Sequence, residues 1–436
     1  MRHESIDPQL FVGNRRRLAR LLPPGSIAVV NANDLLPTNA DATLRIVPNS
    51  DLFHLTGVEQ EESILVLFPD ADDERHREIL FLRETSELIS IWEGKKLTRE
   101  VAREVTGIRN VQWVSEFPKL FHRLMCEAEH VWLDSNEHKR AEIVVETREA
   151  RFVHWVKERY PLHHYYRLAR LLHRVRVTKQ AAEIQLLQQA CDVTQAGFER
   201  VARFVQPGVS EHEIEAEFAH EFIRRRSTFA YNPIIASGAN ACVLHYVEND
   251  QPCRDGDLLL LDVAACHANY NADLTRTLPV NGHFTRRQRQ VYEAVLRALR
   301  AGIAGLKPGV KWKHWQEAAE ELLARECVDL GLLKATDLHK ASDDPTKRPV
   351  KKYFMHGLGH PLGLDVHDVG FTTEPFAAGW VMTVEPGLYI REEGIGVRLE
   401  NDILITDKGP VDLMANIALE PGEIEALMAS RPVAQT

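Results

Sequence analysis

The sequence predicts an α/β N-terminal domain followed by an α+β C-terminal domain that is built from two related halves. Three observations predict this fold class. The chain has 436 residues, which is enough for two domains. Its first part alternates short β-branched runs with helical stretches, and its later part repeats one order of elements. We therefore expect an N-terminal domain over residues 1–172 and a C-terminal domain over residues 173–436.

The N-terminal domain is predicted from short runs of apolar and β-branched residues, which are typical of buried strands. The expected strands are Ser26–Val30, Ile64–Phe68, Ile79–Leu82 and His130–Leu133. The expected helices are Glu100–Thr106 and Phe117–Glu127. A basic run from His163 to Arg176, HHYYRLARLLHRVR, is typical of an amphipathic helix or a linker. This alternation indicates a compact α/β domain.

The C-terminal domain is expected to begin with a long helix near Thr178, which we interpret as its capping residue. Apolar positions on one helical face follow at Ile184, Leu187, Cys191, Phe198 and Val201. The helix should end before Pro207-Gly208.

The order helix, Pro-Gly-Val, acidic helix, hairpin occurs twice in this domain. Pro207–Val209 precedes SEHEIEAEFAHEFIRR and a hairpin-like apolar region. A second helix, from Arg286 to Gly305, leads to Pro308–Val310, the acidic stretch HWQEAAEELLARE and another hairpin-like region. The repeat predicts two related halves that face each other.

The first hairpin region, DGDLLLLDVAACHANYNADLTRTLPV, carries Asp262 and Asp273 with turn residues at 267–269. Folding about the midpoint of the two acids sets them opposite each other, with Cβ atoms about 4.5–5.5 Å apart. In the second region, VMTVEPGLYI and GIGVRLENDILIT flank a turn at residues 391–394, which sets Glu385 opposite Glu400. Like charges this close share a proton or hold a cation between them.

Between the two pairs lies HGLGHPLGLDVHD, with His356, His360 and His367. A buried neutral histidine needs partners for both ring nitrogens, so three in one apolar run indicate a binding function. Four carboxylates and one imidazole are a donor set that suits Mn²⁺ better than a thiolate-type zinc site. Four negative charges call for two ions, bridged by water or hydroxide. Solvated or salt-bridged acids are the alternative, and either pair alone would favour it.

The composition excludes several other classes of function. A formal charge of −10 argues against a nucleic-acid partner. The sequence contains no run of eighteen apolar residues, so we expect no membrane span. The N-terminal stretch MRHESIDPQLF lacks the apolar segment of a secretory signal, and the six cysteines form no CxxC pair. We therefore expect a cytoplasmic protein with free thiols.

Three ordered motifs carry a resemblance to a known family: HGLGHPLGLDVHD, the Asp262–Asp273 pair ending in ADLTRT, and TVEPGLY with GVRLEND. Together they resemble the metal-dependent pita-bread peptidases, and within them the bacterial-type aminopeptidase P. The segment RIVPNSDLFHLTGVEQEESILVLF resembles the N-terminal domain of aminopeptidase P. The resemblance thus covers nearly the whole chain and implies a pita-bread catalytic domain with pseudo-two-fold symmetry.

The resemblance implies two bound divalent ions, most often manganese, with Zn²⁺, Co²⁺ or Fe²⁺ as alternatives. The implied metal ligands are Asp262, Asp273, His360, Glu385 and Glu400. Asp273 and Glu400 would be the bridging carboxylates. The implied reaction is release of the N-terminal residue from peptides with proline in second position, by attack of a hydroxide that bridges the two ions.

Further residue roles are implied by the same resemblance. Glu385 would shuttle the proton, while His245 and His367 would orient the substrate and stabilise the tetrahedral oxyanion. His356 and Arg398 match positions of the proline-side pocket and of a charge pair beside the metal ligands. The remaining substrate-binding position would be Tyr389, for which core packing is the alternative. Trp92, within IWEGKKLT, would reach the active site of a neighbouring subunit in a homodimer or homotetramer, a buried or edge aromatic being the alternative.

The sequence departs from the family pattern at several places. The first metal motif of the family usually has a glycine after Asp-Ala, whereas here Val263 and Ala264 follow Asp262. Ala272 precedes Asp273 where glycine is usual, and Asn401 follows Glu400 where an acid is common. These departures remove no ligand but bear on pocket shape. Two other functions remain open. Prolidase, an Xaa-Pro dipeptidase, shares the fold and ligands, and a metal-free pita-bread protein would serve only as a binding module.

Overall fold

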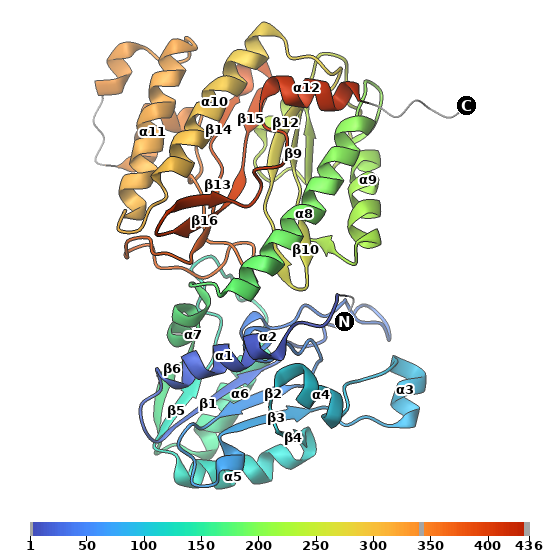
Figure 1. The fold of residues 1–436 in the computed structure, drawn as a ribbon, viewed down its shortest axis with the longest axis vertical. Helices are drawn as coiled ribbons and strands as arrows, with labels where there is room; N and C mark the ends of the chain where they lie inside the picture. The colour runs from blue at the N-terminus through green and yellow to red at the C-terminus, as the bar shows by residue number, and fades with distance from the viewer. Residues whose placement is uncertain (1–2, 340–343, 431–436) are drawn as a thin grey trace. The chain divides into compact units, whose positions relative to one another are not determined.

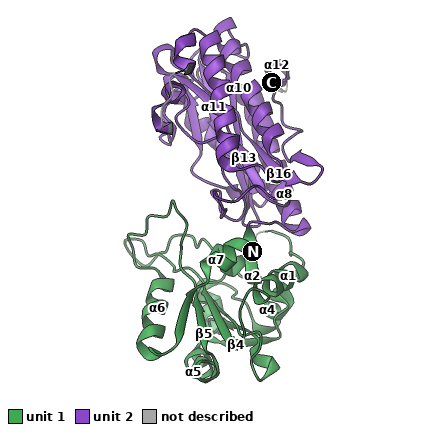
Figure 2. Ribbon diagram, turned by 90° about the vertical axis from the view of Figure 1, so that its left-hand side faces the viewer, with its two compact units in different colours: residues 1, 3–176 green, residues 2, 177–436 purple. Residues whose placement is uncertain are grey.

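The structure, a computed structural model, describes residues 3–339 and 344–430 and contains two compact units, coloured separately in Figure 2. The first unit ends at Arg176 and the second begins at Val177. A boundary after residue 172 would cut helix α7 (Ala169–Arg176), which belongs to the first unit as a whole.

The N-terminal unit contains one six-stranded mixed sheet with helices on both faces (Figure 1). Its strands are β1 (Ser26–Asn31), β2 (Ile64–Leu67), β3 (Glu78–Leu82), β4 (Asn110–Trp113), β5 (His130–Leu133) and β6 (His164–Arg167), in the order β4-β3-β2-β1-β5-β6. Its other helices are α1 (Pro8–Ala19), α2 (Ser50–Thr56), α3 (Glu87–Glu93), α4 (Arg99–Thr106), α5 (Phe117–Glu127) and α6 (Arg148–Arg159). Strand β1 pairs in parallel with β5 and antiparallel with β2.

Strand β1 shows why this sheet is covered on both sides. Ile27 and Val29 belong to an apolar cluster with α5 and α6 residues, while Ala28 and Val30 belong to a second cluster with residues of α1, α2, α4 and α7. Successive side chains point to opposite faces of a strand, so a strand buried throughout needs a core on each face. The expected α/β domain is therefore confirmed.

In the second unit, helices pack against several short sheets (Figure 1). Its helices are α8 (Ala181–Phe204), α9 (Glu211–Arg224), α10 (Arg286–Gly305), α11 (Trp312–Asp329) and α12 (Pro421–Ala429). Its strands are β7 (Thr228–Phe229), β8 (Ile234–Ser237), β9 (Leu258–Asp262), β10 (Ala265–His267), β11 (Tyr270–Asn271), β12 (Thr275–Pro279), β13 (Val381–Val384), β14 (Gly387–Ile390), β15 (Ile395–Arg398), β16 (Asn401–Thr406) and β17 (Gly409–Asp412). The capping residue of α8 is Gln180, which forms a capping box with Glu183, so the prediction of Thr178 was wrong by two positions.

The predicted repeat is present in the backbone. Both Pro-Gly-Val turns place their glycine in the left-handed region, with φ of +94° at Gly208 and +88° at Gly309. The backbone N–H of Gly208 donates to Cys253, and the equivalent N–H of Gly309 donates to Phe376. Each turn thus joins two helices and pairs with a later segment of its own half.

The first hairpin, which carries Asp262 and Asp273, differs from the predicted register. Asp262 pairs with Thr275, and Asp273 lies just outside the ladder. The reason is the small β10–β11 hairpin, whose turn is at Ala268 and Asn269, both with positive φ, rather than at the midpoint of the two acids. A shift of two positions keeps a side chain on the same face of a strand, so both acids still project to one side.

The second hairpin, which carries Glu385 and Glu400, has the predicted register. Val384 pairs with Asn401 in the β13–β16 ladder, and Gly387 pairs with Arg398 in the β14–β15 ladder. Between these two ladders, Glu385 and Glu400 stand opposite each other. The prediction for this pair is confirmed.

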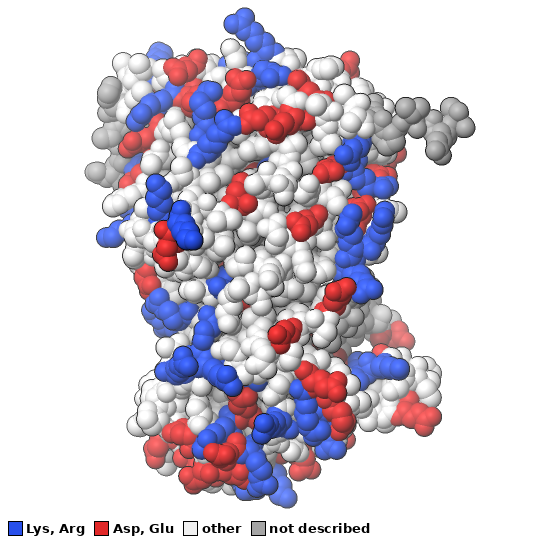
Figure 3. Space-filling view, viewed as in Figure 1, with Lys and Arg blue, Asp and Glu red and all other residues white. Residues whose placement is uncertain are grey.

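The distribution of surface charge, the state of the cysteines and the character of the helices can be compared with what the composition predicts. On the face in Figure 3, lysine and arginine side chains are interspersed with aspartate and glutamate and form no continuous basic stripe. All six cysteines are free thiols. Among the described helices, none is long and apolar enough to cross a membrane.

Candidate active site

The two hairpins and the histidine-rich segment meet at a cavity of about 320 Å³ in the second unit. Every residue expected at the site lines this cavity except Tyr389, which lies directly behind it. Further lining residues are Tyr231, Asn232, Ile234, Leu244, Val247 and Val366. The structure therefore brings together residues that are as far apart in the sequence as His245 and Glu400.

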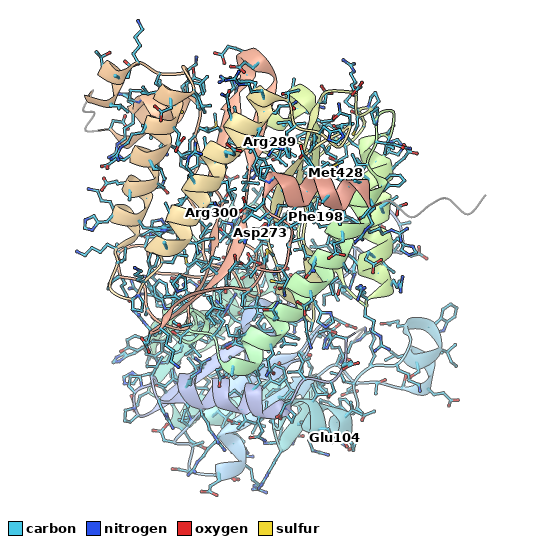
Figure 4. The ribbon with its side chains drawn as sticks, turned by 45° about the horizontal axis from the view of Figure 1, so that its top comes forward. Glu104, Phe198, Asp273, Arg289, Arg300 and Met428 are labelled. Atoms are coloured by element: carbon cyan, nitrogen blue, oxygen red, sulfur yellow. The ribbon has the colours of Figure 1, made fainter. Side chains whose placement is uncertain are left out.

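Three of the expected metal ligands form a tight group. One donor atom each of Asp273, His360 and Glu400 lies within 4.8 Å of the others, and all three side chains are buried. Figure 4 labels Asp273 among the strands of the second unit. Asp262 and Glu385 line the same cavity, with a Glu385 carboxylate oxygen 3.7 Å from His360 Nε2. The arrangement can hold a cation between carboxylates that come from both halves.

The hydrogen bonds of His360 favour a metal-binding role. Its Nδ1–H donates to the carbonyl oxygen of Pro361 at 3.0 Å. In the neutral ring, Nε2 then carries a lone pair, which faces Asp273 Oδ2 at 3.4 Å and Glu385. A lone pair directed at two carboxylates requires either a proton or a metal ion between them. Metal-binding histidines commonly donate their other ring N–H to a carbonyl in this way.

The electrostatics of the acids give a test of whether a metal fits. Burial, and then repulsion from Asp273 and Glu385, raise the pKa of Glu400 well above its usual value. Burial raises the pKa of Glu385 to about 7 against the lowering effect of His360, and burial also raises the pKa of Asp262 against the attraction of Arg398. Buried carboxylates that repel one another are stabilised by a cation. The donor set therefore fits divalent metal ions.

Asp262 is held from two sides. Tyr231 donates its hydroxyl to Oδ1 at 2.6 Å, and Arg398 donates from Nη2 to Oδ2. Arg398 also donates from Nε to Thr275, whose hydroxyl donates to Glu400 at 2.6 Å. Arg398 thus forms an ion pair with Asp262 and is connected to Glu400 through Thr275, so it links carboxylates of both hairpins.

His356 is joined to the same network through Arg398 and Tyr389. Arg398 Nη1 donates to the Tyr389 hydroxyl at 2.9 Å, this hydroxyl donates to His356 Nε2 at 2.8 Å, and His356 Nδ1–H donates to Gly357. Burial, and then the charge of Arg398, lower the pKa of His356 to about 3. Its ring is therefore neutral, with both nitrogens satisfied.

His245 and His367 are both exposed at the cavity. His367 packs edge-to-face against His360, with ring centroids 4.2 Å apart. His245 lies on an irregular segment after the turn Gly238–Cys242. Exposed imidazoles beside buried carboxylates are suited to contacting a substrate.

Sequence reasoning missed three residues that support the ligands. Tyr231 precedes strand β8 and gave no distinguishing signal. Thr275 and Asp402 follow Asp273 and Glu400 by two positions, so the two-residue period of strands could have placed each beside a ligand. Asp402 is fully buried, and it accepts the backbone N–H of Asp273 at 3.0 Å.

Comparison with known proteins agrees with this geometry. Residues 185–407 match the model of metallopeptidase family M24, and residues 11–132 match the aminopeptidase P N-terminal domain. Xaa-Pro aminopeptidase of Escherichia coli K12 is 34% identical over 98% of each chain. The structure of E. coli aminopeptidase P with the inhibitor Pro-Leu matches with a TM-score of 0.85 and 33% identity over 98% of this chain and 99% of that one.

A second solved structure, zinc-substituted E. coli aminopeptidase P in complex with product, also matches with a TM-score of 0.85 and 33% identity, over 99% of this chain and 100% of that one. These matches extend over both units, and they confirm the pita-bread fold of the second. The chain, which carries an aminopeptidase P N-terminal domain, belongs to metallopeptidase family M24.

Proposed function

We propose that this metallopeptidase is an Xaa-Pro aminopeptidase, which removes the N-terminal residue from peptides with proline in second position. The observation that carries the proposal is the convergence of four carboxylates and His360 Nε2 on a cavity that three further histidines line. Full-length similarity to Xaa-Pro aminopeptidases supports the substrate class. We assign Asp262, Asp273, His360, Glu385 and Glu400 as ligands of two divalent ions, with Mn²⁺ the first choice because the donors are mainly hard oxygens.

When bound, divalent ions supply a strong nucleophile by lowering the pKa of water towards neutrality. The side chains of the protein transfer the proton and position the substrate. Glu385, which is next to His360, transfers a proton to the leaving nitrogen of proline. His245 and His367 hold the scissile carbonyl and stabilise the negative charge that develops on its oxygen. The neutral His356, fixed by Tyr389, lies on the side of the proline ring.

The chemistry of an Xaa-Pro bond explains why an acid-rich cavity suits this substrate. The bond is a tertiary amide without an N–H, so an enzyme cannot hold the peptide through that donor. An acid-rich cavity attracts the free α-ammonium group of the substrate instead. Attraction of this group favours removal of a single N-terminal residue.

The first test is a peptidase assay with metal analysis. Full-length protein loaded with Mn²⁺ should cleave an Xaa-Pro-Yaa tripeptide, and Asp273→Ala or Glu400→Ala should lose more than about a thousandfold in kcat and bind less metal. The control is Asp407→Ala, an exposed carboxylate near the surface turn after β16, which should leave both unchanged. Full turnover by either ligand variant would refute the assignment.

Prolidase activity is the main alternative, and the same tripeptide separates the two. An aminopeptidase cleaves Xaa-Pro-Yaa, whereas a dipeptidase hydrolyses Xaa-Pro and leaves the tripeptide intact. Rapid dipeptide hydrolysis without tripeptide cleavage would establish prolidase. Absence of both activities in metal-loaded protein would favour a binding module.

We also propose that the protein forms a homodimer or homotetramer. Helix α3 exposes Leu88, Ile91 and Trp92, with 80% of Trp92 accessible. This exposure excludes a buried aromatic, the first of the two alternatives, and we propose that Trp92 reaches the active site of a neighbouring subunit. Trp92→Ala should weaken assembly in sedimentation experiments and lower turnover. An unchanged mass of the assembly together with unchanged turnover would exclude this role.

We also propose a cytoplasmic location, which the free thiols support.

A further inference from the structure

The segment 237–251 runs from the end of β8 through the 3₁₀ turn Gly238–Cys242 to residues 243–251, which carry His245 and contain no helix or strand. His245 is exposed at the cavity, while its neighbour Tyr246 is buried. Asn249, further along the segment, has a positive φ of +47°. An exposed side chain on an irregular segment keeps a fixed position only if the backbone around it is held.

Glu211, the first residue of α9, holds this segment. Its side chain is fully buried, and its carboxylate accepts four hydrogen bonds. The donors are Ser237 N at 2.8 Å, Asn240 Nδ2 at 3.4 Å, Tyr246 Oη at 2.7 Å and Gln251 N at 2.9 Å. All four donors are neutral, and they lie on both sides of His245 in the sequence.

One turn further along α9, a second carboxylate acts on the same segment. Glu215 accepts a hydrogen bond from Asn249 Nδ2 at 2.9 Å. Asn249 Oδ1 in turn accepts the backbone N–H of Ile235 in strand β8 at 3.1 Å. The helix therefore fixes the end of the segment as well as its middle, and the positive φ of Asn249 is supported by its side-chain contacts.

We propose that Glu211 is a positioning residue for catalysis, which holds the segment so that His245 faces the scissile carbonyl. The proposal rests on the proposed function, in which His245 contacts the substrate. Glu211 itself touches neither the substrate nor the metal ligands in this arrangement; it acts through the Tyr246 hydroxyl and the backbone on either side of His245.

Glu211→Gln is a sharp test because it changes the volume very little. Each oxygen of Glu211 accepts two hydrogen bonds, whereas glutamine has one acceptor oxygen and an NH₂ group. In the variant, the NH₂ group faces the backbone N–H of Ser237 or of Gln251, which cannot accept a hydrogen bond, and that end of the segment shifts. A misplacement of about 1 Å can cost about a hundredfold in rate.

The experiment is a double-mutant cycle on the full-length, Mn²⁺-loaded protein with an Xaa-Pro peptide. Glu211→Gln should lower kcat about tenfold to a hundredfold and change KM less than about threefold. In the His245→Ala background, whose residual kcat is the baseline, Glu211→Gln should change kcat by less than about twofold, because the group that it positions is gone. The matched control is Glu213→Gln, on the same turn. Its side chain accepts the Ser210 N–H in the capping box, a bond that glutamine can also accept, and the variant should leave kcat unchanged.

Equal losses from Glu211→Gln with and without His245 would overturn the proposal, since the residue would then act through the fold in general. A wild-type kcat in the single variant would overturn it as well. If Glu211→Gln does not fold, Tyr246→Phe decides: it removes one donor, and it should lower kcat only when His245 is present. Failure of the proposed function is a different result, because wild-type protein would then not cleave the peptide at all.

Discussion

Tyr231 shows how much of this site depends on a single hydroxyl group. It donates to Asp262 Oδ1, while Arg398 donates to the other oxygen, so both carboxylate oxygens have fixed directions. Burial, and then the nearby Asp262, raise the pKa of Tyr231 well above its usual value, so its proton stays in place for this bond. A ligand that is oriented in advance loses less freedom when it binds a metal ion.

Tyr231→Phe removes this bond without changing the ring. We expect metal affinity or kcat to fall about tenfold to a hundredfold, as for other groups that orient a metal ligand. Titration of metal-free protein with Mn²⁺, with activity as the readout, measures both quantities. Tyr166→Phe, on the surface of the N-terminal unit, should change neither. A Tyr231→Phe protein with wild-type affinity and rate would show that Arg398 alone orients Asp262.

At the scale of elements, the segment from His360 to Asp368 is fixed by a buried ion pair. Lys179 Nζ lies 2.8 Å from Asp368 Oδ2, and both side chains are almost inaccessible. Gly363 packs so closely that a Cβ there would lie 2.1 Å from Asp368 Oδ2. The loop between two of the active-site histidines is therefore packed against the start of the second unit.

Lys179→Met should destabilise the catalytic unit by about 3 kcal/mol, because it removes the cation beside a buried carboxylate. The double variant Lys179→Met/Asp368→Leu should recover most of this loss, since an apolar pair can replace a buried ion pair. Lys352→Met is the control, because Lys352 pairs with Glu392 at the surface, where such pairs contribute little. Denaturant unfolding measures all three, and a Lys179→Met protein as stable as the Lys352→Met protein would contradict the expectation.

The elements also show which features of the sequence were sufficient to predict the strands and the site. Apolar runs predicted β1, β2 and β3, because strands buried on both faces are largely apolar. Strand β5 was predicted too, although its side chains alternate between buried and half-buried. Strand β6, HYYR, was missed: it lies at the sheet edge with mostly exposed side chains, and its basic composition favoured a helix or linker. The register of the first hairpin was missed because Ala268 and Asn269 adopt positive φ, a choice that depends on tertiary contacts. The donor set of the site could be predicted; Tyr231 and Glu211 could not, since their roles depend on the packing of α9 and β8.

At the scale of the whole molecule, buried acids are not confined to the second unit. The N-terminal unit also contains buried carboxylates, which are rare in globular cores. Glu149 accepts hydrogen bonds from the backbone and side chain of Asn31, and Asp134 lies nearby. Arg176 forms an ion pair with Asp51 at the same place. Burial, against the effect of the Asn31 bonds, raises the pKa of Glu149 to about 7.

This pKa predicts a pH dependence of stability. For an acid whose pKa is higher in the folded protein, the stabilisation is complete below its unfolded pKa of about 4.5 and is lost as the pH rises through about 7. Unfolding free energies measured between pH 5 and 8 should therefore fall less steeply with pH in Glu149→Gln than in the wild type. Glu142→Gln, an exposed acid, should keep the wild-type slope. Identical slopes in all three proteins would contradict the prediction.

The continuous register of the second hairpin has a consequence for evolution. Glu385 and Glu400 lie between two ladders, so their opposition is maintained by β13–β16 even if the distal end of the hairpin changes. Insertions or deletions in the exposed tip at residues 391–394 can therefore accumulate among descendants without separating the two acids.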